Sequence, residues 1–167
     1  MRLKSMLLVG IAAVAAASVA VQAGAGTRPA TRVSGTYTVD PKAKVKNDCR
    51  PISKANPAVL TCTVSGFTLV YSGSLDGRGV NTFRWIVNCA TGKTYTDGTE
   101  RFTGSVEGVG SGSFSWGVRS TGTFDCKKGE VTSVSATENL YSGTGALAGM
   151  YGTMHRGSKT YSGALSS

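Results

Sequence analysis

Residues 94–124 read TYTDGTERFTGSVEGVGSGSFSWGVRSTGTF, and this stretch decides the class of fold. Apolar or aromatic residues alternate with Thr and Ser on both sides of a glycine-rich centre at residues 108–112. Alternation with a period of two is typical of strands that bury one face, and glycine supplies the positive φ of tight turns. The stretch therefore predicts two strands, 94–107 and 113–124, that form an antiparallel hairpin.

The same pattern continues on both sides of this hairpin. Helical periodicity is weak, and short glycine-containing turns between the alternating runs imply antiparallel neighbours. Residues 47–57, with two prolines, predict the one long loop, and residues 146–149 are compatible with one helical turn. Eight strands in a meander favour an all-β, eight-stranded, up-and-down barrel, because closure leaves no unpaired edge. The eight strands are expected at residues 32–40, 59–71, 80–89, 94–107, 113–124, 131–141, 150–156 and 159–164.

The first 23 residues have the character of a secretory signal peptide. Arg2 and Lys4 precede an uncharged, largely aliphatic run, residues 6–21, which leads into small residues ending at Ala23. The run is short for a bilayer span, so cleavage after Ala23 is favoured over the alternative of a retained membrane anchor. We therefore predict a signal peptide at 1–23, a flexible segment at 24–31 and a single barrel domain at 32–167. The mature protein is expected to be secreted or periplasmic, without a membrane anchor.

The chain is basic. Its formal net charge of +9 falls to +7 when Arg2 and Lys4 are removed, which favours weak attraction to anionic surfaces. Aromatic residues are not interleaved with the basic ones, so nucleic acid is not an expected partner. Five basic residues gather around the expected long loop, where they either contact an anionic envelope polymer or simply face water. They are Lys42, Lys44, Lys46, Arg50 and Lys54.

Four cysteines, Cys49, Cys62, Cys89 and Cys126, all lie in the part expected to be exported. An oxidising compartment lets disulfides persist, so two bridges are expected. In a meander all four cysteines reach the same rim, and of three formal pairings we favour Cys49–Cys62 with Cys89–Cys126. The opposite rim, at residues 72–79, 108–112 and 143–149, is then expected to be the more mobile end and the place of the mouth if the barrel has one. Because the spacing fits no zinc motif and the only histidine is His155, no metal or other cofactor is expected.

Alternation also predicts which side chains point into the barrel. Large aromatic residues share a face in three of the expected strands, with no recognisable catalytic set among them. We therefore expect a small apolar or amphipathic ligand to bind between these side chains. They are Phe67, Tyr71, Phe83, Trp85, Phe114 and Trp116.

Two acids fall in register with apolar residues. Glu100 aligns with Phe102, and Glu138 aligns with Leu140. A carboxyl group inside the barrel would have a raised pKa, which is how a general acid or base is made, so these two are the candidate catalytic residues. The alternative is that each lies near a rim and is wetted or paired with a residue such as Arg101 or Arg119. His155 has no evident catalytic partner and is expected to be structural.

The C-terminal half resembles a known group of barrels. The resemblance rests on residues 101–108 (RFTGSVEG), 112–114 (GSF), 122–124 (GTF) and above all 143–149 (GTGALAG) followed by Gly152. They are similar to an uncharacterised bacterial group with the allene-oxide-cyclase-like barrel, which plant dirigent proteins also have. The resemblance covers residues 71–164.

This resemblance implies a calycin-like barrel with an apolar cavity, and its plant relatives suggest a homo-oligomer. No family motif carries catalytic residues onto this sequence. Three functions therefore stay open. The first is ligand binding in the barrel, and the second is an envelope or interaction protein with a filled barrel. The third is an isomerase or cyclase of the allene-oxide-cyclase or dirigent type.

Overall fold

The computed structural model describes residues 29–167, so the predicted signal peptide lies outside the described residues, as does most of the predicted flexible segment. The described residues form nine strands and no helix, which confirms the all-β prediction. The last predicted flexible residue already belongs to the first strand. The strands are β1 (Thr31–Val39), β2 (Lys46–Ser53), β3 (Asn56–Gly73), β4 (Leu75–Asn88), β5 (Lys93–Val106), β6 (Gly110–Asp125), β7 (Glu130–Gly145), β8 (Tyr151–Arg156) and β9 (Thr160–Ser166).

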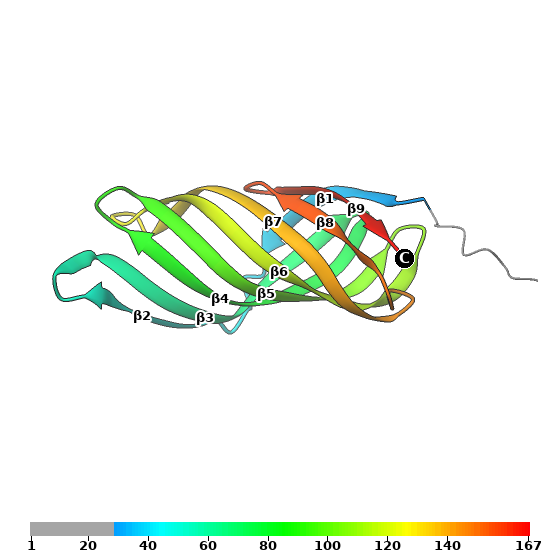
Figure 1. Ribbon diagram of the computed structural model, residues 1–167, viewed down its shortest axis with the longest axis horizontal. Coiled ribbons are helices and arrows are strands. Elements are labelled where there is room, and N and C mark those ends of the chain that lie inside the picture. The colour runs from blue at the N-terminus through cyan, green and yellow to red at the C-terminus, as the bar shows by residue number, and fades with distance from the viewer. Residues whose placement is uncertain (1–28) are drawn as a thin grey trace, which may run out of the picture.

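All nine strands belong to one antiparallel sheet that returns on itself. The order is β1-β9-β8-β7-β6-β5-β4-β3-β2, and β1 also pairs with β3, so every strand except β2 takes part in a ring (Figure 1). Apart from the step that skips β2, neighbours in the ring are neighbours in sequence or the two chain ends. Short connections therefore suffice throughout, as the glycine-containing turns predict.

The ring is closed over only part of its length. β1 pairs with β3 at residues 69–73, and β8 pairs with β7 at residues 136–140. We call the length bounded by these pairings the closed part. Beyond it, β3 to β7 continue as a sheet edged by β2, which we call the open part, and which extends to the left in Figure 1.

β3 runs through both the open part and the closed part, and it contains one extra residue, a bulge, between them. Ser65 pairs with Thr82 and Phe67 with Asn81, which leaves Gly66 as a bulge with a φ of +74°. Before the bulge the even-numbered Val64 is buried, whereas after it the odd-numbered Leu69 and Tyr71 are buried. The bulge therefore reverses which alternate residues of β3 face the interior.

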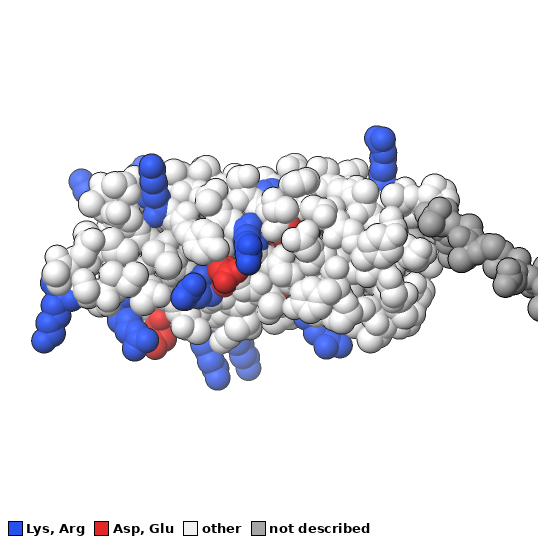
Figure 2. Space-filling model, in the orientation of Figure 1, with Lys and Arg blue, Asp and Glu red and all other residues white. Residues whose placement is uncertain are grey.

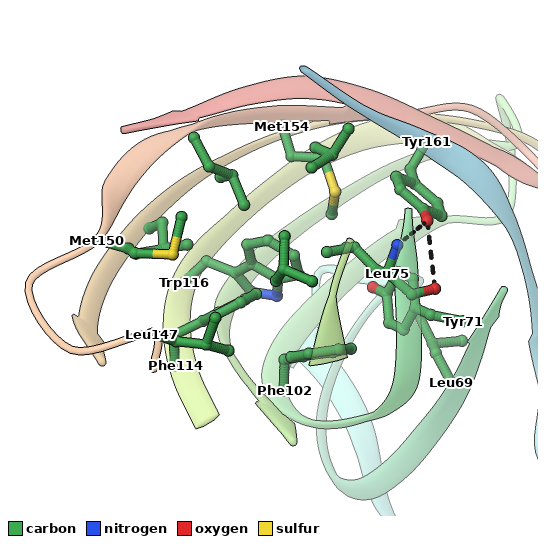
Figure 3. Packing of buried hydrophobic residues seen from close by; sticks show 14 of the residues in the cluster. Leu69, Tyr71, Leu75, Phe102, Phe114, Trp116, Leu147, Met150, Met154 and Tyr161 are labelled. Carbon is green, nitrogen blue, oxygen red and sulfur yellow. Dashed lines mark hydrogen bonds between the residues drawn. The ribbon is translucent and has the colours of Figure 1, made fainter. Parts of the chain in front are cut away.

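Aromatic side chains fill the closed part (Figure 3). Phe102 stacks on Phe114 with ring centroids 4.8 Å apart, and Phe114 meets Trp116 at 4.7 Å. Leu75 and Leu147, both with no exposed surface, close the end at which we predicted a mouth. That prediction is wrong, because the glycine-rich turns there bring buried leucines over the ring instead of leaving it open.

The predicted long loop at residues 47–57 is also wrong. Residues 46–53 form β2, which pairs with the first half of β3. Proline disfavours a central strand, but Pro51 is tolerated here because β2 is the edge of the sheet. The segment is held by one of two disulfides, Cys49–Cys62, and the other joins Cys89 to Cys126, so the predicted pairing is confirmed. Both bridges lie in the open part.

No helix long and apolar enough to cross a membrane occurs among residues 29–167. The two disulfides are typical of proteins that work in an oxidising compartment outside the cytoplasm.

Candidate functional site

Arg156 is the centre of a buried group of polar side chains. It is the last residue of β8 and therefore lies where the closed part ends. From there its Nη1 donates hydrogen bonds to Glu100 Oε2 on β5 and to the Tyr71 hydroxyl on β3, both at 2.8 Å. Its Nη2 forms an ion pair with Oε1 of Glu138 on the adjacent strand β7. One guanidinium thus connects four strands across the ring.

Glu100 is completely buried, and both of its carboxyl oxygens accept a hydrogen bond. The hydroxyl of Tyr71 donates to its Oε1 at 2.7 Å while accepting from Arg156. Burial, together with the charge of Glu100, raises the pKa of Tyr71 well above its ordinary value, so this hydroxyl stays protonated and can donate. Gly79 on β4 makes room for the carboxylate, since a Cβ at that position would overlap Oε1 of Glu100.

Glu138 is the less satisfied acid of the two. It too has no exposed surface, and within residues 29–167 neither of its carboxyl oxygens has a hydrogen bond of good geometry, although Oε1 lies against Nη2 of Arg156. Burial raises the pKa of Glu138 from its ordinary 4.5 to about 8, with a smaller contribution from the charge of Glu100 and opposition from Arg156. At neutral pH Glu138 is therefore mostly protonated.

The arrangement corrects the predicted partners of the acids. Neither Arg101 nor Arg119 reaches them, because odd-numbered residues of β5 and β6 face outward at these positions. Arg119 pairs with the exposed Asp97 at 3.6 Å, and Arg101 donates to Ser113 on the outer face. The partner that the acids do have, Arg156, was missed. It alternates with the buried Met154, and that shared face was the signal that could have identified it.

Of the four side chains in this group, only Arg156 lines either of the two surface pockets. Pockets of about 530 and 520 Å³ indent the described surface, and neither is lined by Glu100 or Glu138. The second pocket crosses β1, β7, β8 and β9 and includes Arg156 and Tyr161 in its lining. Arg156 lies 5.4 Å from the ring centroid of Tyr37, which further encloses it. His155 points outward, and its Nδ1 lies 3.4 Å from Thr137 Oγ1.

The six predicted ligand-binding aromatics fall into two sets. Tyr71, Phe114 and Trp116 belong to the packed core of the closed part. Phe67, Phe83 and Trp85 are only half-buried and lie on the inner side at the start of the open part. The structure therefore does not bring all six around one space.

The half-buried set gains a member that sequence reasoning missed. Phe67 meets Phe83 at 5.8 Å, and Trp85 meets Phe124 at 4.8 Å between ring centroids. Trp85 is on β4 and Phe124 is on β6, so the two side chains meet over β5 on the side of the sheet that continues the interior of the ring. We call Phe67, Phe83, Trp85 and Phe124 the aromatic face.

The basic residues predicted around the long loop are exposed along β2 and its flanks, as all five side chains face water. Figure 2 shows lysine and arginine side chains at both ends and along the lower edge of the molecule, with few acidic ones beside them. On the face that Figure 2 shows, they do not gather into a single patch.

Comparison with known proteins gives a family without a described activity. A search of curated proteins finds no match. A crystal structure of a protein of unknown function from the DUF3224 family of Shewanella oneidensis MR-1 is similar, with a TM-score of 0.59 and 18% identity over 82% of this chain and 97% of that one. The family model "Protein of unknown function (DUF3224)" matches residues 33–164, which confirms that the resemblance points to an uncharacterised group. This chain belongs to the DUF3224 family.

Proposed function

We propose that this protein is an exported binding protein that holds a small amphipathic ligand on the aromatic face. The observation that carries the proposal is the contrast between the two aromatic sets. The core set is fully packed, whereas Phe67, Phe83 and Trp85 remain partly open to solvent on the inner side of the curved sheet. Concave apolar surfaces with a few polar groups are the usual form of small-ligand sites.

Polar groups lie at the inner end of the aromatic face, which is why we propose an amphipathic ligand. Asn81 pairs with Phe67 and precedes Phe83 by two residues on the same side of β4. Its side chain is 3% exposed, and its Nδ2 has no hydrogen-bond partner within the described residues. A ligand with an apolar body and one oxygen acceptor would match this donor and the apolar rings beyond it.

Several expectations from the sequence support an exported scaffold of this kind. The N-terminal 23 residues have signal-peptide character, and two disulfides suit a secreted or periplasmic location. We also propose that the ring is an eight-stranded barrel of the calycin-like or allene-oxide-cyclase-like kind. Its open part would then replace the cavity that such barrels enclose, since the closed part is filled.

The two tryptophans allow a direct test. Fluorescence is measured while decanoic acid and decanol are added separately to the wild type, to Trp116→Phe and to Trp85→Phe. A ligand on the aromatic face should change the emission of Trp85 in the Trp116→Phe protein. It should leave the fully buried Trp116 in the Trp85→Phe protein unchanged.

Affinity provides the second part of this test. Phe83→Ala should weaken binding by roughly tenfold, the loss expected for one well-packed apolar contact. Binding that changes Trp116 but not Trp85 would contradict the proposal, as would no response of Trp85 to either compound.

A second candidate is contact with an anionic envelope polymer. Its supporting observation is a set of exposed basic side chains on the outer side of the open part, opposite the aromatic face: Lys46, Arg50, Arg84, Lys93 and Arg119. Retention on immobilised heparin that falls steeply with salt would favour this function, because exposed charges are screened within about 10 Å at 0.1 M salt. The cyclase or isomerase alternative has less support, since neither buried acid lines either of these two pockets of the described surface.

A further inference from the structure

A polar pocket of about 530 Å³ lies on the outer face of the closed part. Its lining combines one acid and one base, Asp76 and Arg101, with five hydroxyl side chains. Those hydroxyls are Thr103, Ser105, Ser111, Ser113 and Thr144. The pocket thus offers many hydrogen-bond donors and acceptors, and its two opposite charges leave it without net charge.

The floor of this pocket is an ordered polar network. The Ser113 side chain is only 7% exposed, and its hydroxyl lies 2.8 Å from that of Thr144. Nη2 of Arg101 donates to the same Ser113 oxygen at 3.3 Å. These contacts fix the orientation of three lining side chains before any ligand arrives, which lowers the entropy cost of binding.

Two exposed tyrosines lie next to the pocket on the same outer face. Tyr141 is 47% exposed and Tyr151 is 58% exposed. Leu140 pairs with Gly152 in the last pair of the β7–β8 register, and Tyr141 on β7 and Tyr151 on β8 are the residues that directly adjoin this pair. Ser115 links them to the pocket, since it pairs with Tyr141 on one side and with Arg101 on the other.

A backbone irregularity positions Tyr141 in this way. Phe114 pairs with Gly143 and Ser115 with Tyr141, which leaves Ser142 as an extra residue in β7. Ser142 has a φ of +47° and is the one non-glycine residue of the described chain with a positive φ. Because of this bulge, Leu140 and Gly143 both lie on the inner face of β7, and Tyr141 between them points outward.

We propose that this outer face binds a neutral glycan chain, with sugar rings against Tyr141 and Tyr151 and sugar hydroxyls in the adjoining polar pocket. A pyranose has an apolar C–H face and a rim of hydroxyls, which matches two exposed aromatic rings beside a cluster of hydroxyls and two opposite charges. A protein surface would instead be expected to offer a larger apolar patch here. The site is separate from the aromatic face, which lies on the inner side of the other half of the sheet.

Affinity electrophoresis tests the proposal with the full mature protein. The protein migrates through native gels that contain hydroxyethylcellulose, laminarin or glycol chitin, each a soluble polysaccharide without charged groups. At least one of them should slow the wild type. Tyr141→Ala and Tyr151→Ala should each weaken the apparent affinity about tenfold, whereas Tyr141→Phe should retain most of it because the ring face remains.

Tyr95→Ala is the matched control. Tyr95 is 39% exposed on the outer side of β5 but lies in the open part, away from the pocket, so its loss should leave the retardation unchanged. Retardation by none of the three polysaccharides would overturn the proposal, as would an equal loss in Tyr95→Ala. Retardation that disappears in 0.5 M salt would also overturn it, because that result would indicate attraction by charge. None of these outcomes depends on ligand binding at the aromatic face.

Discussion

Arg156 and Glu100 form a 2.8 Å hydrogen-bonded ion pair that joins two strands on opposite sides of the ring. β8 and β5 are separated by two strands in one direction and by four in the other. No backbone pairing connects them, so this contact, with the Tyr71 hydroxyl that bridges the same two side chains, ties together strands that are not neighbours in the sheet. Its position at the end of the closed part makes it the last interior contact before the sheet opens.

Replacing Arg156 with Met should destabilise the protein by about 3–5 kcal/mol, because it would leave Glu100 buried and unpaired. Urea denaturation followed by circular dichroism measures this loss. Arg119→Met is the matched control, since Arg119 pairs with Asp97 at an exposed position and should contribute under about 1 kcal/mol. Equal effects of the two substitutions would show that Arg156 does not brace the ring.

Glu138 should make the protein less stable as the pH rises. Its pKa is about 8 in the folded protein and 4.5 ordinarily, so the folded state binds more protons than the unfolded state between these values. The stability contributed by the protonated acid is therefore complete below pH 4.5 and is lost as the pH rises toward about 8, by an amount on the order of a few kcal/mol. Glu138→Gln should flatten this dependence in denaturation curves recorded from pH 5 to 8.5. An unchanged slope in that variant would mean that another group is responsible.

Gly79→Ala should be costly for a different reason. The added methyl group would occupy the space of the Glu100 carboxylate, so the acid would have to leave Tyr71 and Arg156. Overpacking of this kind costs about 1–3 kcal/mol. Gly117→Ala provides the comparison, because a Cβ there meets no atom within 4 Å. Thermal unfolding should show a clear drop in Tm for the first variant and almost none for the second.

Ser142→Gly should stabilise the protein. A left-handed φ destabilises a residue that has a side chain by about 1–2 kcal/mol, and glycine avoids this strain. Part of the gain is offset because glycine increases the conformational entropy of the unfolded chain. The expected net gain is roughly 0.5–1 kcal/mol in chemical denaturation. A loss of stability instead would indicate that the Ser142 side chain makes a contact worth more than the strain.

The two disulfides should contribute unequally. Cys89 and Cys126 are 37 residues apart, and Cys49 and Cys62 are 13 apart. Chain entropy predicts a loss of about 4 kcal/mol for Cys89→Ser/Cys126→Ser and about 3 kcal/mol for Cys49→Ser/Cys62→Ser. Denaturation of the two double variants gives the comparison. The reverse order would mean that the β2 hairpin depends on its bridge more than loop length suggests.

Local alternation was sufficient to predict the strands, their antiparallel order and the cysteine pairing. It failed at β2, where Pro51 and the surrounding charges are typical of a loop but are also what an edge strand tolerates. It also left open the burial of Glu100 and Glu138. Their burial depends on Arg156, more than fifty residues beyond Glu100, and no local pattern encodes a partner on the other side of a ring.

The sequence also did not predict over what length the ring of strands is closed. It is set by the register between β1 and β3 and by the shortness of β8, both of which are long-range properties. For this reason we predicted that six aromatic residues line one cavity. In the structure three of them pack in the core of the closed part, and the other three lie at the start of the open part.

The glycine at position 66 has a broader consequence. One inserted residue reverses which alternate side chains of β3 point inward. The residues before and after it therefore pack against different sets of neighbours. Substitutions in residues 56–64 can remodel the open part without disturbing the packing around Tyr71, and the converse also holds. A single bulge thereby divides one continuous strand into two units, and a substitution that suits one of them places no demand on the other.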